Sequence, residues 1–344
     1  MKIAVILFNL GGPDKLENVE PFLFNLFYDP AILNLPKFLR YPLAKLISNR
    51  RAPIAKKIYE ELGGSSPILK LTQEQAVALD IKLNENDENK KYKSFVVMRC
   101  WHPRAEEVIK KVQLYSPDEI ILLPLYPQYS AATSGSSIKE WNDVCKKKNC
   151  KIKTSVICCY PTDDNFINAH IKKINESINN LKNFKLIFSA HGLPEKNIKK
   201  GDPYQWQVEQ SVKKIVSKLN NPDLDWILSY QSRVGPLKWI GPSTDNVIVE
   251  NSKIGKNIVL VPIAFVSEHS ETLVELDIEY KKLAQDNGCK KYVRTPALGT
   301  NDIFINSLSE IILKKNENKF NDYLFPPKIQ CPSKFTKCPC LNYE

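Results

Sequence analysis

Eight short apolar runs, separated by amphipathic stretches, set the strongest limit on how this 344-residue chain can fold. Each run has the length of a buried strand, and stretches such as Phe166 to Leu181 have the apolar spacing of a helix. Strands that alternate with helices indicate βαβ units and parallel sheets, so we expect an α/β fold. The expected strands are residues 3–8, 94–99, 119–125, 153–159, 185–190, 225–230, 257–265 and 292–297.

The chain is longer than one small hydrophobic core requires, and we therefore expect two domains. The strands divide into two sets of four, and a lysine-rich loop at Lys146 to Asn149 marks the join. The sequence contains no Gly-x-Gly-x-x-Gly motif, so nothing supports a dinucleotide site. The expected parts are a first domain over 1–150 joined by the helix near 300–316, a second domain over 151–298, and a cysteine-containing tail over 317–344.

Charge and composition narrow the class of function. The net charge of +11 comes from lysines that are scattered along the chain, without the basic-aromatic motifs of nucleic-acid-binding modules, so we expect no nucleic-acid partner. A basic surface suits an anionic small substrate or an anionic membrane face. No apolar run is long enough to span a bilayer and the first strand lacks a signal-peptide cleavage site, so we expect a cytoplasmic protein with reduced cysteines.

Residues 21–47 are unusually rich in apolar and aromatic side chains. Three prolines, Pro30, Pro36 and Pro42, are expected to divide this segment into short helices. Two interpretations stay open. The segment is either ordinary core or a partly exposed apolar lip that contacts an apolar ligand or a membrane face.

One histidine is placed where a strand is expected to end. The apolar run Lys185 to Phe188 leads into Ser189-Ala190-His191, and Gly192 and Pro194 then end the strand. In open α/β sheets, ligands bind in the crevice beyond the carboxyl ends of the strands. His191 is therefore a candidate functional residue, and a satisfied histidine in a turn is the alternative.

A row of glutamates follows a second strand end, beside His269. Glu268, Glu271, Glu275 and Glu279 recur at spacings of three and four residues on an expected helix. Like charges at this spacing repel one another by roughly a few tenths of a kcal/mol per pair. A solvated acidic face is one explanation, but the position at a strand end favours carboxylates that bind a divalent cation or relay protons.

These segments and others, in order along nearly the whole chain, resemble the signature motifs of the ferrochelatase family. The resemblance implies an enzyme that inserts Fe²⁺ into protoporphyrin IX, with release of two protons, in the terminal step of haem biosynthesis. It also implies two similar Rossmann-like domains, each with a four-stranded parallel sheet flanked by helices, and a porphyrin cleft between them. The matching segments are Asn9 to Pro13, Arg50-Arg51, Gly63 to Ile68, Tyr126 to Ser130, Ser134 to Ser137, Phe188 to Pro194, Tyr230 to Pro236 with Trp239 and Gly241-Pro242, and Ser267 to Leu273.

The same resemblance implies roles for individual residues. His191 is either the proton acceptor or a ligand of the substrate Fe²⁺, and Glu271 faces it to deliver iron or to complete the proton path. A neutral imidazole has an ordinary pKa of roughly 6.5, which suits proton acceptance near neutral pH. Glu268, Glu275 and Glu279 are implied as a proton or metal relay. The implied porphyrin-binding residues are Leu10, Leu26, Phe27, Arg50, Arg51, Ser66, Arg99, Tyr129, Trp239 and Phe265.

Three thiols lie close together in the tail, at Cys331, Cys338 and Cys340. In a reducing compartment such a group indicates a metal site, and both zinc and iron–sulfur clusters accept four thiolates. By resemblance to cluster-bearing bacterial members of the family, we expect a [2Fe–2S] cluster whose fourth ligand is Cys158 or Cys159. Structural zinc is the alternative cofactor.

The partners implied by the resemblance are protoporphyrin IX and ferrous iron, with peripheral contact to the inner face of the cell membrane and a homodimer as one allowed assembly. Three alternative functions stay open: a coproporphyrin ferrochelatase, another tetrapyrrole metal chelatase, or a non-catalytic porphyrin or haem carrier.

Overall fold

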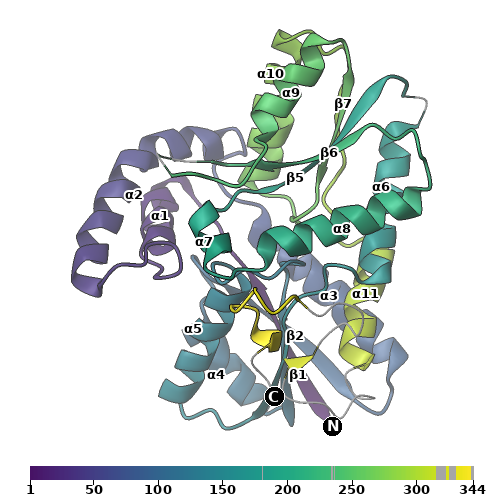
Figure 1. Ribbon diagram of the computed structural model, residues 1–344. Helices are drawn as coiled ribbons and strands as arrows, with labels where there is room; N and C mark the ends of the chain where they lie inside the picture. Colours follow the sequence, from purple (N-terminus) through teal and green to yellow (C-terminus); the bar gives the residue numbers. More distant parts are fainter. Residues whose placement is uncertain (180, 234, 236, 315–322, 325–330, 342–344) are drawn as a thin grey trace. The chain divides into compact units, whose positions relative to one another are not determined.

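The computed structural model describes residues 1–179, 181–233, 235, 237–314, 323–324 and 331–341, and these divide into two compact units. The first unit contains Met1–Tyr126, Ser130–Cys158, and the chain from Leu308 to the end of α11 (Asp302–Lys314) together with strand β9 (Tyr323–Leu324). The second unit contains Pro127–Tyr129, Cys159–Ser307 and the described tail, residues 331–341. Figure 1 labels the helices and strands and colours them by their position in the sequence.

A parallel sheet of five strands forms the centre of the first unit, in the order β2-β1-β3-β4-β9. Its other strands are β1 (Lys2–Asn9), β2 (Lys91–Met98), β3 (Glu119–Pro124) and β4 (Lys153–Ile157). The helices of this unit before α11 are η1 (Leu16–Asn18), α1 (Val19–Phe27), α2 (Lys37–Glu60), α3 (Ile68–Asn86), α4 (Ala105–Tyr115) and α5 (Ser134–Lys147).

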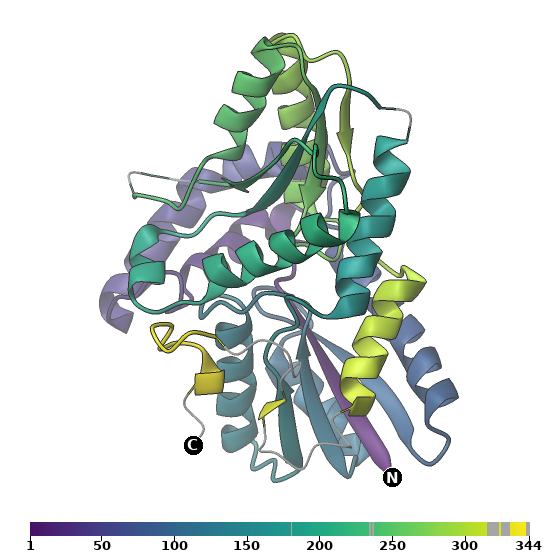
Figure 2. The ribbon, with the colours of Figure 1, turned by 45° about the vertical axis from the view of Figure 1, so that its right-hand side comes forward.

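Helices cover both faces of this sheet, which explains why its strands are apolar on both sides. Alternate residues of β1, namely Ala4, Ile6 and Phe8, pack with α4 and α5, and Trp141 of α5 is fully buried among them. α3 contacts β1 and β2 and lies on the other side of the sheet in Figures 1 and 2. A separate apolar cluster joins α1 and α2 around Phe22.

The second unit is built on a four-stranded parallel sheet in the order β6-β5-β7-β8. One face packs against α9, the π-helix η2 and α10 through Ile187, Leu260 and Leu276. α6 and α8 pack on one another, and α6 also contacts β7. The elements are α6 (Asp164–Ile178), β5 (Phe184–His191), α7 (Glu195–Lys199), α8 (Tyr204–Leu219), β6 (Trp226–Gln231), α9 (Thr244–Lys253), β7 (Asn257–Pro262), η2 (Glu271–Glu279), α10 (Tyr280–Asp286), β8 (Tyr292–Arg294) and η4 (Pro339–Leu341).

The four principal strands of each unit have the same order, 2-1-3-4 by their position in the chain. The expected α/β class, with two similar Rossmann-like units built on parallel sheets, is therefore confirmed. In such sheets the crevice for a ligand lies where the strand order reverses, beyond the carboxyl ends of the first and third strands. In the second unit these are the carboxyl ends of β5 and β7.

The observed division of the chain differs from the expected one in three places. β4 pairs with β3, so the first unit extends to Cys158 rather than ending at residue 150. The second unit continues past residue 298 to Ser307, because the division falls inside α11. The first sheet also gains β9 from the segment that we expected to be wholly tail, because two residues of that segment pair with β4.

The expectation that Pro42 ends a helix is wrong. α2 runs for 24 residues, from Lys37 to Glu60, with Pro42 and Pro53 inside it. A proline inside a helix removes the hydrogen bond to the carbonyl four residues earlier. For Pro42 that carbonyl belongs to Phe38, which is 74% exposed, so water can satisfy the carbonyl and the helix continues. Over the described part of the chain, no helix is both long and apolar enough to span a membrane.

Candidate active site

His191 and Glu271 meet at the place where the strand order of the second sheet reverses. His191 is the last residue of β5, and Glu271 is the first residue of η2, which follows β7. The Nδ1 atom of His191 lies 2.9 Å from Oε2 of Glu271. The side chains are 39% and 26% exposed, so a ligand can reach both. The expectation that these two residues face one another agrees with the observed geometry.

The two groups change each other's ionisation. Burial disfavours the imidazolium, but the neighbouring Glu271 carboxylate outweighs burial and raises the pKa of His191 above its ordinary value. Burial likewise favours the neutral acid at Glu271, but His191 opposes it and holds the pKa of Glu271 well below its usual range. The pair therefore contains an ionised carboxylate beside an imidazole of increased basicity.

Glu275, one turn further along η2, is the most heavily hydrogen-bonded carboxylate of this site. Its Oε2 accepts from Ser232 Oγ at 2.5 Å and from Gln231 Nε2 at 3.2 Å, and its Oε1 accepts from the Ser232 amide at 3.0 Å and from Tyr280 Oη at 2.9 Å. Burial and the nearby Glu271 charge raise the pKa of Glu275. Ser232 Oγ also lies 3.3 Å from Glu271 Oε2, so one hydroxyl contacts both carboxylates.

The backbone around this site adopts conformations that few residues tolerate. Ser232 has φ of 59°, in the left-handed region, and this turn points its amide and hydroxyl toward η2. Gly192 follows His191 directly, and a Cβ atom there would lie 2.9 Å from the Gln231 carbonyl oxygen and 3.3 Å from Trp239. η2 is a π-helix, a form that is frequent at functional sites.

Two glutamates of the predicted relay lie apart from these contacts. Glu268 accepts from Arg294 at 2.8 Å and from the Ala297 amide at 2.8 Å. Burial opposes its ionisation, but Arg294 holds the pKa of Glu268 below its ordinary value. Glu279, at the end of η2, is exposed. Of the four glutamates, only Glu271 and Glu275 share hydrogen-bond partners among the described residues, and the relay roles of the other two stay predictions.

Three predicted porphyrin-binding residues belong to the second unit. Trp239 forms an isolated bridge with Pro194, three residues after His191. Phe265 packs edge-on against His269, with 4.6 Å between the ring centroids, and that histidine follows the strand that leads to Glu271. Tyr129 is nearly buried and is held through its backbone amide by Gln207 of α8.

Six others belong to the first unit and lie just after β1, on α1 and α2, or just before α3. Leu10, Leu26 and Phe27 are partly buried against the apolar cluster of α1 and α2. Arg50 and Arg51 are exposed on α2, with Arg51 above the Phe27 ring at 5.5 Å. The remaining residue of this group is Ser66, whose amide donates to the Pro13 carbonyl at 2.8 Å.

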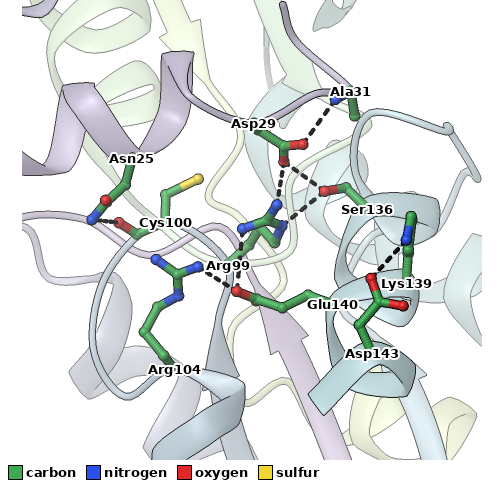
Figure 3. A network of polar contacts seen from close by, with 10 residues as sticks. All are labelled: Asn25, Asp29, Ala31, Arg99, Cys100, Arg104, Ser136, Lys139, Glu140 and Asp143. Atoms are coloured by element: carbon green, nitrogen blue, oxygen red, sulfur yellow. Dashed lines mark hydrogen bonds and ion pairs between the residues drawn. The ribbon is translucent and has the colours of Figure 1, made fainter. Parts of the chain in front are cut away.

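Arg99 lies in a polar network of the first unit (Figure 3). Its guanidinium pairs with Asp29 at 2.9 Å, donates to Ser136 Oγ at 2.8 Å and contacts Glu140 at 3.4 Å. Ser136 also donates to Asp29 at 2.5 Å, and Arg104 pairs with Glu140. All three guanidinium nitrogens of Arg99 are thus engaged within this unit, so the network supports a structural role, and porphyrin binding by Arg99 stays a prediction.

The tail brings two of its thiols together in the second unit. Cys331 and Cys338 are buried in one small apolar cluster with Phe335. The Cys338 thiol and burial raise the pKa of Cys331, and the thiol of Cys159 contributes to the same shift. Cys158, also buried, belongs to the first unit. The side chain of Cys340 lies outside the described residues.

Cysteine thiols are soft donors of the kind that iron–sulfur clusters and zinc accept, so the donor type at the tail fits either cofactor. Within the described residues, however, no group of three or more His, Cys, Asp or Glu side chains is arranged to hold a metal ion.

Comparison with known proteins identifies the family. The ferrochelatase family model matches residues 2–316. A protein named ferrochelatase from Pelagibacter ubique (strain HTCC1062) is 77% identical over 344 residues, covering 100% of both chains. The chain belongs to the ferrochelatase family. The ferrochelatase of Rickettsia bellii (strain OSU 85-389) is also similar, with 52% identity over 99% of this chain and 96% of the relative.

Membership in the ferrochelatase family confirms the resemblance and the expected enzyme class, one that inserts metal into a porphyrin in haem biosynthesis. Two solved structures of SirB from Bacillus subtilis, one with cobalt and one with Fe³⁺, show the same fold at 13% identity. Their TM-scores are 0.54 and 0.55, over 93% of this chain and 97% and 99% of SirB.

Sequence reasoning assigned no role to three residues that take part in the hydrogen bonds of this candidate site, namely Gln231, Ser232 and Tyr280. The first two lie in the segment Tyr230 to Pro236, which had marked the family, so their position at the end of β6 offered a signal. Tyr280 offered no signal, because nothing in the sequence shows that its phenol donates to Glu275, five residues earlier.

Proposed function

We propose that this chain inserts Fe²⁺ into protoporphyrin IX and that His191 accepts the protons that the pyrrole nitrogens lose. The observation that supports this proposal is the 2.9 Å contact between His191 Nδ1 and Glu271 Oε2 at the reversal point of the sheet. A carboxylate can only accept at that contact, so Nδ1 carries the hydrogen and Nε2 keeps a free lone pair. Nε2 is therefore the atom that takes the proton.

A path for the proton away from His191 follows from the same contacts. The imidazolium formed is stabilised by Glu271, and Ser232 Oγ bridges Glu271 and Glu275 at 3.3 and 2.5 Å. Because the pKa of Glu275 is raised by burial and by Glu271, this carboxyl holds a proton more readily than its neighbour. We propose that protons pass from His191 through this pair, while Fe²⁺ enters the porphyrin as the second substrate.

The reaction is tested by adding protoporphyrin IX and Fe²⁺ to the full chain without oxygen and measuring haem as its pyridine complex. We expect haem to form catalytically, and protoporphyrin to be a better substrate than coproporphyrin III. Preference for coproporphyrin would support the alternative chelatase. A chain that binds porphyrin or haem in stoichiometric amounts without forming haem would be a carrier.

We further propose that α2 contacts a membrane surface. Leu46 and Ile54 are 47% and 68% exposed, and with Arg50 between them they recur every four residues along one face of α2. Apolar side chains interleaved with basic ones are typical of helices that lie in the interface of an anionic membrane. Contact of this kind suits an enzyme whose substrate and product are large apolar discs.

Replacing both Leu46 and Ile54 with aspartate is expected to lower binding to vesicles that contain anionic lipid by about tenfold or more, since two apolar anchors become charged. Flotation of the full chain with such vesicles measures this loss. The matched control replaces Leu114 of α4 and Ile254, directly after α9, with aspartate. These residues are 87% and 70% exposed, and the control should float like wild type. Equal flotation of the two double variants would reject α2 as the contact surface.

For the tail, we propose that Cys331, Cys338 and Cys340 bind one [2Fe–2S] cluster with Cys159 as the fourth ligand. Support for Cys159 over Cys158 comes from the electrostatic influence of its thiol on Cys331 within one unit. When bound, the cluster would supply four strong bonds that tie the tail to Cys159, at the start of the long central segment of the second unit. Cytoplasmic location and a homodimer stay predictions.

Chain purified without oxygen is expected to contain about two iron and two acid-labile sulfide per molecule. Cys159→Ser should remove most of both, because a hydroxyl is a poor ligand for this cluster, and Cys158→Ser is the matched control that should retain them. Loss of the cluster in Cys158→Ser but not in Cys159→Ser would show that Cys158, and not Cys159, is the fourth ligand. A colourless chain with one bound zinc would establish the structural-zinc alternative.

A further inference from the structure

One buried side chain, Gln207 of α8, contacts both the C-terminal tail and the segment that carries Tyr129. Its Oε1 accepts from the Tyr129 amide at 2.7 Å, and its Nε2 donates to Cys331 Sγ at 3.3 Å. Gln207 is 1% exposed. A backbone amide can only donate, so the oxygen of Gln207 must face Tyr129 and the nitrogen must face the thiol.

The same face of α8 fixes the neighbouring residue of that segment. Ser211, one turn after Gln207, accepts from Gln128 Nε2 at 3.0 Å and donates to the Pro161 carbonyl at 2.7 Å. Gln128 and Tyr129 therefore depend on two adjacent polar groups of one helix. A substitution at Gln207 directly alters the position of Tyr129, because Gln207 is the hydrogen-bond acceptor for the buried Tyr129 amide.

The tail is fitted closely to the start of α8 by contacts that do not involve its cysteines. The Lys337 amide donates to the Gly201 carbonyl at 3.1 Å, and a Cβ at Gly201 would lie 2.4 Å from Thr336 Oγ1. Phe335 packs on Trp206, the residue before Gln207, with 5.9 Å between ring centroids. Displacement of the tail thus acts on the turn of α8 that contains Gln207.

We propose that Gln207 is a positioning residue that couples the docking of the tail to the placement of Tyr129, and so to porphyrin affinity. The proposal rests on the proposed function and on the role that the family resemblance implies for Tyr129, namely contact with the porphyrin. Its physical basis is that one planar side-chain amide makes both hydrogen bonds. A shift of Nε2 away from Cys331 therefore also shifts Oε1, the acceptor for the Tyr129 amide.

Two substitutions separate the two ends of the amide. Gln207→Leu removes both hydrogen bonds, whereas Gln207→Glu, when ionised, keeps an acceptor for the Tyr129 amide and loses the donor to Cys331. Gln210→Leu, three residues along the same helix, is the matched control. In metal-free, reduced full chain, we expect alkylation of Cys331, followed by peptide mass spectrometry, to be several-fold faster in both Gln207 variants and unchanged in Gln210→Leu.

The coupling itself is tested with porphyrin affinity, measured by fluorescence titration without iron. Phe335→Ala, which loosens the tail without touching a cysteine, should raise the porphyrin Kd several-fold in the wild-type background. Gln207→Leu should raise the porphyrin Kd about tenfold. Adding Phe335→Ala to Gln207→Leu should then raise the Kd little further, since the hydrogen bonds that link the tail to Tyr129 are already absent. Effects that simply add would overturn the coupling, as would unchanged alkylation of Cys331. A wild-type chain that binds no porphyrin would instead reject the proposed function, and the alkylation result would still decide the Gln207 contact.

Discussion

His191→Ala is expected to lower kcat for iron insertion by about 10² to 10⁴-fold, the usual contribution of a positioned general base. The substitution removes the imidazole at the end of β5 whose Nε2 lone pair is left free by the contact between Nδ1 and Glu271. Porphyrin affinity should change little, since the apolar residues proposed to contact the macrocycle remain. The measurement is the initial rate of haem formation, together with a fluorescence titration of porphyrin binding.

His170→Ala would be a poor control, because that imidazole is completely buried and its loss would leave a cavity. His102→Ala is better, since His102 is exposed and belongs to the first unit. It should insert iron at a rate close to wild type. Partial recovery of the activity of His191→Ala by added imidazole would show that the variant is folded and lacks only the base. A variant with near-normal turnover would remove His191 from the mechanism.

Glu271→Gln is expected to change both the rate and its dependence on pH. Proton acceptance needs neutral imidazole, so kcat/KM rises as pH passes upward through the pKa of His191 in the free enzyme. Glu271 raises that pKa in the wild type, so removing the charge should move the acidic limb of the profile to lower pH. The maximal rate should fall at the same time, by roughly tenfold or more, because the imidazolium loses its partner.

Glu268→Gln is the matched control for this charge, since Glu268 lies three residues earlier and is paired with Arg294. Its loss should leave the position of the acidic limb unchanged. An acidic limb that stays in place in Glu271→Gln would show that another group sets it. A limb that moves to higher pH would contradict the assigned direction of the charge effect.

Much of the fold could be predicted because its signals are local. β1 and β5 are continuous apolar runs, and His191 stands directly before the residues that end its strand. β9 could not be predicted, because a two-residue strand has no periodicity and exists only through its pairing with β4. The helix through Pro42 was missed because the exposure of Phe38, which leaves its carbonyl within reach of water, is set by the fold and is not visible in the sequence pattern.

The contact between His191 and Glu271 was expected from the sequence, but the hydrogen bonds around it were not. The spacing of Glu271 and Glu275 suggested one helical face, yet the π-helical form of η2 has no distinct sequence signal. Glu268 shares that spacing but pairs with Arg294, a residue 26 positions away. The pairing of β8 with β7 places Arg294, so the contact is not visible in the local sequence. Gln207 gave no signal at all, because its importance comes from two hydrogen bonds to segments 78 and 124 residues away.

The most direct test of the central claim is a single-turnover experiment without oxygen. Wild type and His191→Ala, each saturated with protoporphyrin IX, are mixed rapidly with Fe²⁺, and the loss of porphyrin fluorescence is followed at one pH above the acidic limb. If the His191–Glu271 pair performs the insertion, wild type loses the fluorescence and yields haem, while His191→Ala keeps bound, unmetallated porphyrin at least a hundredfold longer. Equal rates of fluorescence loss with equal yields of haem would contradict the account.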